Sequence, residues 1–217
     1  MSGLARARDE VARGYRELGR LGLNFGSAGN LSCRVEGGMV ITRSGATVDA
    51  AAEGDTVWMS LEGVARDTPP PSSEWPMHAA ILRAFPAAGS VVHTHADACT
   101  ALACLGEALP AFHYMVAGFG GDDVRCAPYV TFGTPELAEV AVEALRGRTA
   151  CLLGNHGMIV TGRDVGAAVA AALRLETLAR QYLLARSAGT PRLLDAAQMA
   201  ATRERYKTYG AAAPSRA

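Results

Sequence analysis

The sequence has 217 residues, in which 21 lysines and arginines balance 21 aspartates and glutamates. Zero net charge, without a run of Lys or Arg, excludes the basic footprint that nucleic-acid-binding domains normally show. Hydrophobic residues make up 49% and charged residues 19%, a composition typical of a chain that folds around a buried core. A single domain over residues 1–217, ending in a C-terminal tail, is therefore expected.

Hydrophobic periodicity and turn signals predict a mixture of helices and short strands. In chain order the expected elements are a helix over 4–21, strands over 31–35, 38–42 and 56–60, a proline loop over 67–72, a helix over 74–85, a strand over 89–95, a helix over 97–105, a glycine-rich loop over 117–128, a helix over 135–146, strands over 149–154 and 157–161, and helices over 164–186 and 195–208. Thr134 and Ser73 are expected to cap the helices that follow them. This order indicates a mixed α/β sheet with helices packed on it.

The cysteine pattern and the hydropathy of the chain indicate the cellular compartment in which the protein is expected. The chain has five cysteines and no Cys-x-x-Cys, which suits neither a disulfide framework nor a thiolate zinc site. Most of these cysteines are expected to be small buried hydrophobic residues. They are Cys33, Cys99, Cys104, Cys126 and Cys151. No uninterrupted apolar segment of about 18 residues occurs, and the N-terminus lacks a signal-peptide pattern, so a cytoplasmic protein without membrane contact is expected.

Three of the five histidines have a spacing that suits one metal ion. His93 and His95 are two residues apart in a predicted strand, so their side chains share one face of the sheet. An isolated His-x-His pair is more often packed or exposed than metal-bound. His156, at the turn between two predicted strands, changes that balance by offering a third ligand. Three histidines and an open position are the pattern of a catalytic zinc.

Glu74 is a candidate carboxylate to act with this metal. It follows Ser72 and Ser73 at the predicted start of a helix, and it could be a fourth ligand or a general base. The plainer alternative is an acidic residue favoured at a helix N-terminus. His78, one turn later, and His113 are not assigned to the metal.

Three segments offer backbone amides and hydroxyls that suit an anion such as phosphate. Taken singly, each is ordinary turn sequence. Their candidate residues are Asn30, Ser44, Gly45, Ser72 and Ser73.

Taken in order, the motifs of the chain resemble those of the zinc-dependent class II aldolase/adducin-like family, and within it the L-fuculose-1-phosphate aldolases. The resemblance extends over nearly the whole chain. The matching motifs are Gly29-Asn30-Leu31-Ser32, Ile41-Thr42-Arg43-Ser44-Gly45, Ser72-Ser73-Glu74, His93-Thr94-His95 and Asn155-His156-Gly157, with further support at His113-Tyr114-Met115, Cys126-Ala127-Pro128-Tyr129, Thr131-Phe132-Gly133-Thr134 and Lys207-Thr208-Tyr209-Gly210. The resemblance implies a three-layer α/β/α fold with a mainly antiparallel central sheet. It also implies a homotetramer with active sites at subunit interfaces.

The resemblance further implies roles for individual residues. One Zn²⁺ per subunit, or another divalent metal, would be held by His93, His95, His156 and Glu74. Glu74 would also be the acid/base, and the phosphate pocket would comprise Asn30, Ser44, Gly45, Ser72 and Ser73. Tyr114 would act at the aldehyde end, and Tyr209 would reach an active site from the tail. The contributions of Arg43, where the family commonly has proline, and of the acidic pair Asp122 and Asp123 are left open.

The implied reaction is the reversible cleavage of a ketose 1-phosphate, such as L-fuculose 1-phosphate, to dihydroxyacetone phosphate and an aldehyde such as lactaldehyde. In the condensation direction Glu74 would remove a proton, Tyr114 would protonate the new alkoxide, and the metal would stabilise negative charge. The single lysine, Lys207, lies in the tail, which argues against a Schiff-base route.

Other activities could use the same three histidines. The alternatives are a pentulose-phosphate 4-epimerase, a methylthioribulose-1-phosphate dehydratase and a 5-deoxypentulose-1-phosphate aldolase. Epimerases of this family typically have aspartate at the position of Glu74, so the glutamate favours an aldolase. A non-catalytic adducin-like scaffold would have lost metal ligands that this chain keeps.

Overall fold

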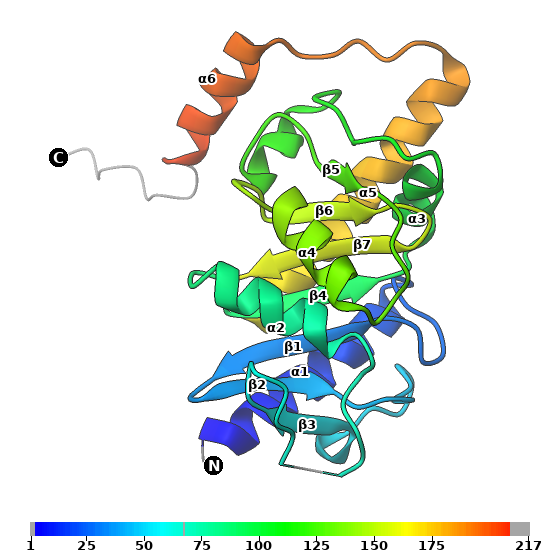
Figure 1. Cartoon of the computed structure of the whole chain (residues 1–217). Helices are drawn as coiled ribbons and strands as arrows, with labels where there is room; N and C mark the ends of the chain where they lie inside the picture. Colours follow the sequence, from blue (N-terminus) through cyan, green and yellow to red (C-terminus); the bar gives the residue numbers. More distant parts are fainter. Residues whose placement is uncertain (1–2, 67, 209–217) are drawn as a thin grey trace, which may run out of the picture.

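The computed structural model describes residues 3–66 and 68–208, and they form three layers (Figure 1). The central layer is a seven-stranded sheet in the order β3-β2-β1-β4-β7-β6-β5. Its strands are β1 (Asn30–Val35), β2 (Gly38–Thr42), β3 (Thr56–Met59), β4 (Ser90–Thr94), β5 (Arg125–Ala127), β6 (Ala150–Leu153) and β7 (Gly157–Gly162). Every neighbouring pair is antiparallel except β5 and β6, which are parallel.

Different helices cover the two faces of the sheet. The helices are α1 (Gly3–Arg20), α2 (Trp75–Ala84), α3 (Asp97–Cys104), α4 (Pro135–Ala144), α5 (Val165–Ala188) and α6 (Ala196–Tyr206), with short 3-10 turns η1 (Glu53–Asp55) and η2 (Tyr114–Phe119). Helices α1, α3 and α5 share one apolar core with the sheet, and α2 and α4 share the other. Along β7, Met158 and Val160 join the first core and Ile159 the second, because alternate strand residues face opposite sides. The predicted α/β/α fold is confirmed.

Helix starts show which local predictions hold. The hydroxyl of Thr134 accepts the amide of Leu137 at 3.3 Å, so the predicted cap of α4 is confirmed. The predicted Ser73 cap of α2 is wrong, because Glu74 occupies the N-cap position and makes no side-chain capping bond. Its carboxylate turns instead toward the histidines described below. The hydroxyl of Ser72, one residue before Ser73, accepts a hydrogen bond from the amide of Glu74 at 3.3 Å and so stabilises the start of α2.

The predicted glycine-rich loop over 117–128 was only partly right. It contains the end of η2 and the whole of β5. Strand β5 has three residues and pairs in parallel with β6, placing Cys126 opposite Leu152. A strand this short has too few residues to show an alternating pattern, and its partner lies some two dozen residues away in the sequence.

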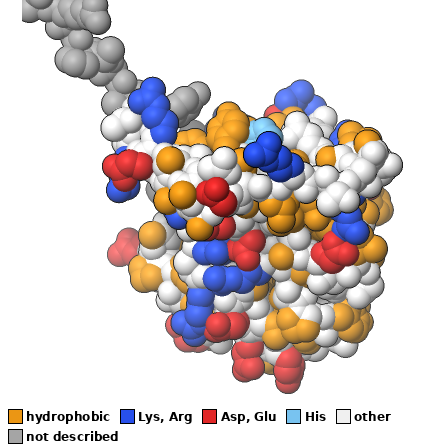
Figure 2. Space-filling view, turned by 90° about the horizontal axis from the view of Figure 1, so that it is seen from above, with side chains coloured by type: hydrophobic (Ala, Val, Ile, Leu, Met, Phe, Trp, Pro, Cys, Tyr) orange, Lys and Arg blue, Asp and Glu red, His pale blue; other side chains and the backbone are white. Residues whose placement is uncertain are grey.

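The surface charges are mixed in sign (Figure 2), as the balanced composition suggests, and most of the cysteines are at least partly buried. Figure 2 shows acidic and basic side chains interspersed on the face that it presents. Cys33, Cys99 and Cys151 are buried as predicted, whereas Cys104 is exposed and Cys126 half-buried. All five are free thiols. Among residues 3–66 and 68–208, no helix has the length and apolar character needed to cross a membrane.

Candidate metal centre

Three histidines meet at one end of the central strands. His93 is in β4, His95 directly follows that strand, and His156 lies in the turn between β6 and β7. Because β4 and β7 are antiparallel neighbours, with Thr94 opposite Met158, this turn lies beside the end of β4. The ring centroids are 4.7–5.0 Å apart, and one ligand atom of each histidine lies within 4.8 Å of the others. The predicted convergence of the three imidazoles is confirmed.

The backbone of the turn explains how His156 reaches the cluster. Asn155 has φ 52°, in the left-handed region that asparagine tolerates better than most residues. A Cβ atom at Gly157 would collide with the carbonyl oxygen of Thr94. Only glycine therefore allows the turn to approach β4 this closely.

Hydrogen bonds and burial set the state of each imidazole. His93 is fully buried, and its Nδ1 donates to the carbonyl of Met158 at 2.9 Å, which leaves Nε2 facing the centre. Such a bond from the second ring nitrogen is usual for metal-ligating histidines. Burial and, to a smaller extent, nearby His93 lower the pKa of His95 to about 4 and that of His156 to about 4. Burial would also lower the pKa of His93, but Glu74 outweighs it and raises that pKa above its ordinary value.

Glu74 completes the centre from the start of α2. Its Oε2 lies 3.2 Å from Nε2 of His93, and its Oε1 lies 3.4 Å from Nε2 of His156. Burial would raise the pKa of this carboxyl, but His93, a hydrogen bond from Asn30 and His156 together lower it below its ordinary value. Oε1 is buried and accepts no hydrogen bond from the described residues. Three imidazole nitrogens beside an unsatisfied carboxylate oxygen form a donor set that fits a divalent metal.

Asn30 and His78 lie behind this carboxylate. Asn30 is directly opposite His93 in the β1–β4 ladder, and its Nδ2 donates to Oε2 of Glu74 at 2.9 Å. Its Oδ1 lies 2.5 Å from Nε2 of His78, whose Nδ1 lies 2.7 Å from the hydroxyl of Ser32. His78, which the sequence left unassigned, is fully buried and lies outside the metal-ligating group, and burial lowers its pKa to about 3.

The segments predicted to bind phosphate are brought together beside Glu74. The amide of Ser44 donates to the carbonyl of Pro70, and the amide of Ser72 donates to that of Thr42, each at 3.0 Å. Ser72 is buried, while Ser44, Gly45 and Ser73 are exposed. The side chain of Asn30 is engaged with Glu74 and His78, so a phosphate contact from it stays a prediction.

The three charged residues left open by the sequence make ion pairs. Arg43 binds the carboxylate of Asp55 at 2.6 Å. Asp123 binds Arg148 at 2.7 Å, and Asp122 pairs with Arg203 of α6. Each of these charges is therefore balanced by a protein side chain.

A pocket of about 320 Å³ opens beside the histidines. It is lined by Glu74, His95, Tyr129, Val130, Phe132, Asn155 and His156. The two aromatic residues, Tyr129 and Phe132, were not predicted as site residues, although exposed aromatic side chains close together in a loop are a usable signal. Tyr114 does not line this pocket. It lies at the start of η2, is 52% exposed and stacks on His113 with ring centroids 4.7 Å apart. Tyr209 lies outside the described residues.

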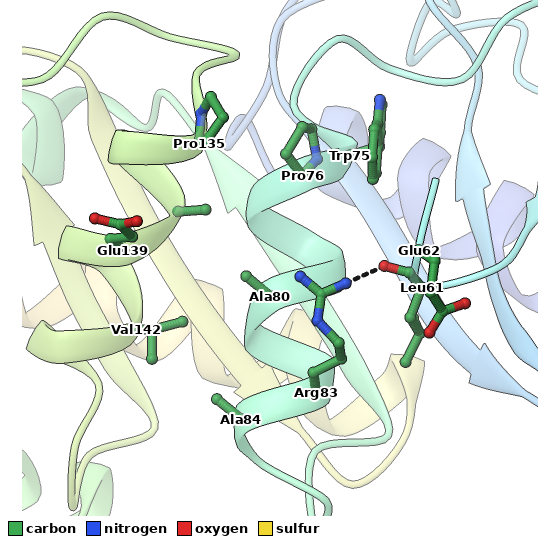
Figure 3. Close-up of a pocket in the computed structure, with 11 residues that line it drawn as sticks. Leu61, Glu62, Trp75, Pro76, Ala80, Arg83, Ala84, Pro135, Glu139 and Val142 are labelled. Carbon is green, nitrogen blue, oxygen red and sulfur yellow. Dashed lines mark hydrogen bonds between the residues drawn. The ribbon is translucent and has the colours of Figure 1, made fainter. Parts of the chain in front are cut away.

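A second hollow lies between α2 and α4 (Figure 3). Its walls are formed by Trp75, Pro76 and Ala80 on one side and by Pro135, Glu139 and Val142 on the other. Arg83 and Leu61 also line this hollow, and the Arg83 side chain donates to the carbonyl of Leu61 (Figure 3). None of the three clustered histidines lines this hollow.

Comparison with known proteins agrees with this geometry. The model of the class II aldolase and adducin N-terminal domain family matches residues 9–183. A 5-methylthioribulose-1-phosphate/5-deoxyribulose-1-phosphate aldolase from Rhodospirillum rubrum is 49% identical over 195 residues, which cover 90% of this chain and 88% of the relative. An L-fuculose phosphate aldolase from Escherichia coli K12 is 43% identical over 196 residues, 89% of this chain and 91% of the relative.

Solved structures share the same fold. A structure of L-fuculose 1-phosphate aldolase superposes with a TM-score of 0.89 at 36% identity, covering 93% of this chain and 96% of its own. YgbL from Escherichia coli, described as a putative aldolase/epimerase/decarboxylase, superposes with a TM-score of 0.82 at 28% identity. The superposition covers 92% of this chain and 99% of the YgbL chain.

Proposed function

The chain belongs to the class II aldolase and adducin N-terminal domain family, as a class II sugar-phosphate aldolase, and on that premise we propose the reaction that it catalyses. It reversibly cleaves a ketose 1-phosphate to dihydroxyacetone phosphate and an aldehyde. The observation that carries this proposal is the buried Glu74 carboxylate, held by Asn30 beside His93 and His156.

Glu74 is placed to move a proton. In the condensation direction its carboxylate takes the proton from the carbon of dihydroxyacetone phosphate that becomes the nucleophile, and in cleavage it returns that proton. The lowered pKa of this carboxyl keeps it ionised, which is the state that can accept a proton. His93, His95 and His156, with Glu74 in the resting site, would hold one divalent ion, expected to be Zn²⁺. When bound, that ion supplies electrostatic stabilisation of the negative charge left by cleavage.

The two ends of the substrate would be held by different segments. Ser44, Gly45, Ser72 and Ser73 form the proposed phosphate end, and their two segments are already paired beside Glu74. Binding energy at the phosphate would orient the reacting carbon atoms. At the other end, Tyr129, Val130 and Phe132 give the pocket an apolar wall. An apolar wall suits a methyl or methylthio terminus, and a relative that is 49% identical is named for the two sugars with these termini, so 5-deoxyribulose 1-phosphate and 5-methylthioribulose 1-phosphate are the proposed substrates.

L-fuculose 1-phosphate is the second candidate substrate, supported by the relative that is 43% identical. The same apolar wall and the same Glu74 would serve it. The difference between the two candidates lies in the aldehyde released, and dihydroxyacetone phosphate is common to both.

A substrate panel with the purified protein tests the proposal. Metal content is measured first, and release of dihydroxyacetone phosphate is then followed with the three ketose 1-phosphates. We expect kcat/KM to be highest for the 5-methylthio or 5-deoxy substrate, by about tenfold over L-fuculose 1-phosphate, the scale on which a pocket discriminates substrates that differ by one small group. Full metal occupancy without cleavage of any of the three would contradict the aldolase assignment and favour the epimerase or dehydratase alternative.

The active site is proposed to be shared between subunits of a homotetramer. Tyr114 is exposed and outside the pocket of its own chain, so it would protonate the aldehyde oxygen in a neighbouring pocket. Tyr209 is proposed to reach an active site from the C-terminal tail.

Mixing two inactive variants tests this sharing. Glu74→Gln and Tyr114→Phe chains, coexpressed at equal levels, should recover up to about a quarter of wild-type activity. In randomly mixed oligomers, about a quarter of the sites combine an intact Glu74 from one chain with an intact Tyr114 from its neighbour. Each variant alone serves as the control. Mixed oligomers with no more activity than the separate variants would show that Tyr114 does not act across an interface.

A further inference from the structure

Buried side chains form a continuous hydrogen-bonded chain behind the Glu74 carboxylate. Ser32 and Asn30 lie two residues apart in β1 and face α2, from which His78 projects between them. The links are 2.7 Å from Ser32 Oγ to His78 Nδ1, 2.5 Å from His78 Nε2 to Asn30 Oδ1, and 2.9 Å from Asn30 Nδ2 to Glu74 Oε2. Ser32 and His78 are fully buried, and Asn30 is 4% exposed.

The chemistry of the end group sets the direction of this chain. An ionised carboxylate only accepts hydrogen bonds, so Asn30 must present its NH2 group to Glu74. The carbonyl oxygen of Asn30 then faces His78, which must donate from Nε2. Nδ1 of His78 is left as an acceptor, and the hydroxyl of Ser32 is its donor.

We propose that His78 is a positioning residue for the reaction: by donating to Asn30 it holds that amide in the orientation that donates to Glu74, and so orients the carboxylate for proton transfer. This role rests on the proposed function of Glu74. Without a donor at position 78, the buried oxygen of Asn30 loses its hydrogen-bond partner, and the amide is no longer fixed from behind. The Asn30 amide and the carboxylate that it holds can then shift relative to the reacting carbon.

The simpler role for His78 is a core histidine that only stabilises the fold. That role predicts lower stability but normal chemistry in any variant that still folds. The positioning role predicts a loss in kcat at unchanged KM, and recovery by a side chain that keeps the donor. Glutamine is such a side chain, since its amide nitrogen can reach about as far as Nε2 of histidine and also donates.

The kinetic experiment compares His78→Leu, His78→Gln and a matched control. The control is Ser90→Ala, because Ser90 is also fully buried but donates to the backbone carbonyl of Ser32 and not to His78. At equal metal content, the exchange of a proton of dihydroxyacetone phosphate with D2O, in the absence of aldehyde, isolates the step assigned to Glu74.

We expect His78→Leu to slow this exchange and kcat by about 10- to 100-fold with KM nearly unchanged, which is the scale of a small misplacement of a reacting group. His78→Gln should recover most of the rate, and Ser90→Ala should stay within about twofold of wild type. Exchange at the wild-type rate in His78→Leu would overturn the proposal. So would a folded, metal-loaded His78→Gln variant that is as slow as His78→Leu.

A spectroscopic measurement separates this inference from the proposed function. In the purified protein with 15N-labelled histidine, the chain requires the proton of His78 to be on Nε2, and its signal should shift in Glu74→Gln. Glu176→Gln is the matched control, because Glu176 is also a buried glutamate but binds the amides of Ala98 and Cys99 on the other face of the sheet. A proton on Nδ1 of His78, or a His78 signal that is unchanged in Glu74→Gln, would disprove this series of hydrogen bonds, whatever reaction the protein catalyses. A correct signal together with no proton exchange by the wild type would instead refute the function assigned to Glu74, and the positioning role with it.

Discussion

Glu74 and Trp75 are neighbours in the sequence, yet they line different hollows. The hollow between α2 and α4, on the Trp75 side, encloses about 630 Å³, whereas the pocket on the Glu74 side encloses about 320 Å³. The smaller pocket is lined by the imidazoles of His95 and His156 and by the carboxylate of Glu74, and the third imidazole, of His93, is fully buried beside them. In the larger hollow, Arg83 is bound to a backbone carbonyl and no such group of ligands converges among the described residues. Strand register, and not the size of a hollow, therefore decides where the candidate catalytic groups meet in this chain.

The largest effect is expected from removing a ligand. His93→Ala should lose the bound metal and reduce cleavage to below about 1% of the wild-type rate, because the stabilisation of charge by the ion is lost with it. Metal analysis and the release of dihydroxyacetone phosphate measure both effects. His113→Ala, a histidine outside the cluster, is the control for metal content. Unchanged metal in His93→Ala would show that the cluster is not the metal site.

The next effect tests the carboxylate. Glu74→Gln should lower kcat by about 10²- to 10⁴-fold, since an amide cannot accept the proton in general acid–base catalysis. The metal should be retained, because the three histidines stay in place. Near-wild-type cleavage by this variant would remove Glu74 from the mechanism, and the two hollows would then differ only in metal binding.

A smaller effect is expected from disturbing the turn that carries His156. Gly157→Ala forces a Cβ atom against the carbonyl of Thr94, so the turn must move away from β4. We expect metal affinity to fall by about 10- to 100-fold, which is the typical effect of losing a contact that orients a metal-ligating side chain. Gly189→Ala is the control, because an added Cβ there meets no atom within 4 Å. Equal metal affinity in the two variants would mean that the close approach at Gly157 is not needed.

The smallest effect is expected in the larger hollow. Glu139→Gln removes a charge from its α4 wall (Figure 3) without touching the histidine cluster. We expect kcat within about twofold of wild type and a free energy of unfolding within about 0.5 kcal/mol, typical of a surface substitution. Steady-state kinetics and urea unfolding measure the two quantities. A large loss of kcat would give this hollow a role in the reaction that its side chains do not indicate.

Several features of the site could be predicted from the sequence alone. His93 and His95 share a face because side chains alternate along a strand, and this holds in any sheet. The turn at His156 follows from two predicted strands and a glycine between them. The helix starting near Glu74 follows from Pro76 in its first turn and Pro86 at its end, although its cap was mispredicted, because Glu74 takes the N-cap position and its carboxylate contacts His93.

Only the tertiary structure decided which groups meet. Asn30 binds Glu74 and His78, 44 and 48 residues away in the sequence, because β1 pairs with β4 in the register that puts Asn30 opposite His93. Arg43 binds Asp55, and Tyr114 does not line the pocket of its own chain. Zero net charge, which argues against a nucleic-acid-binding protein, left this local arrangement undetermined. Periodicity and turn signals act over a few residues, whereas partner choice depends on strand register and helix packing across the whole sheet.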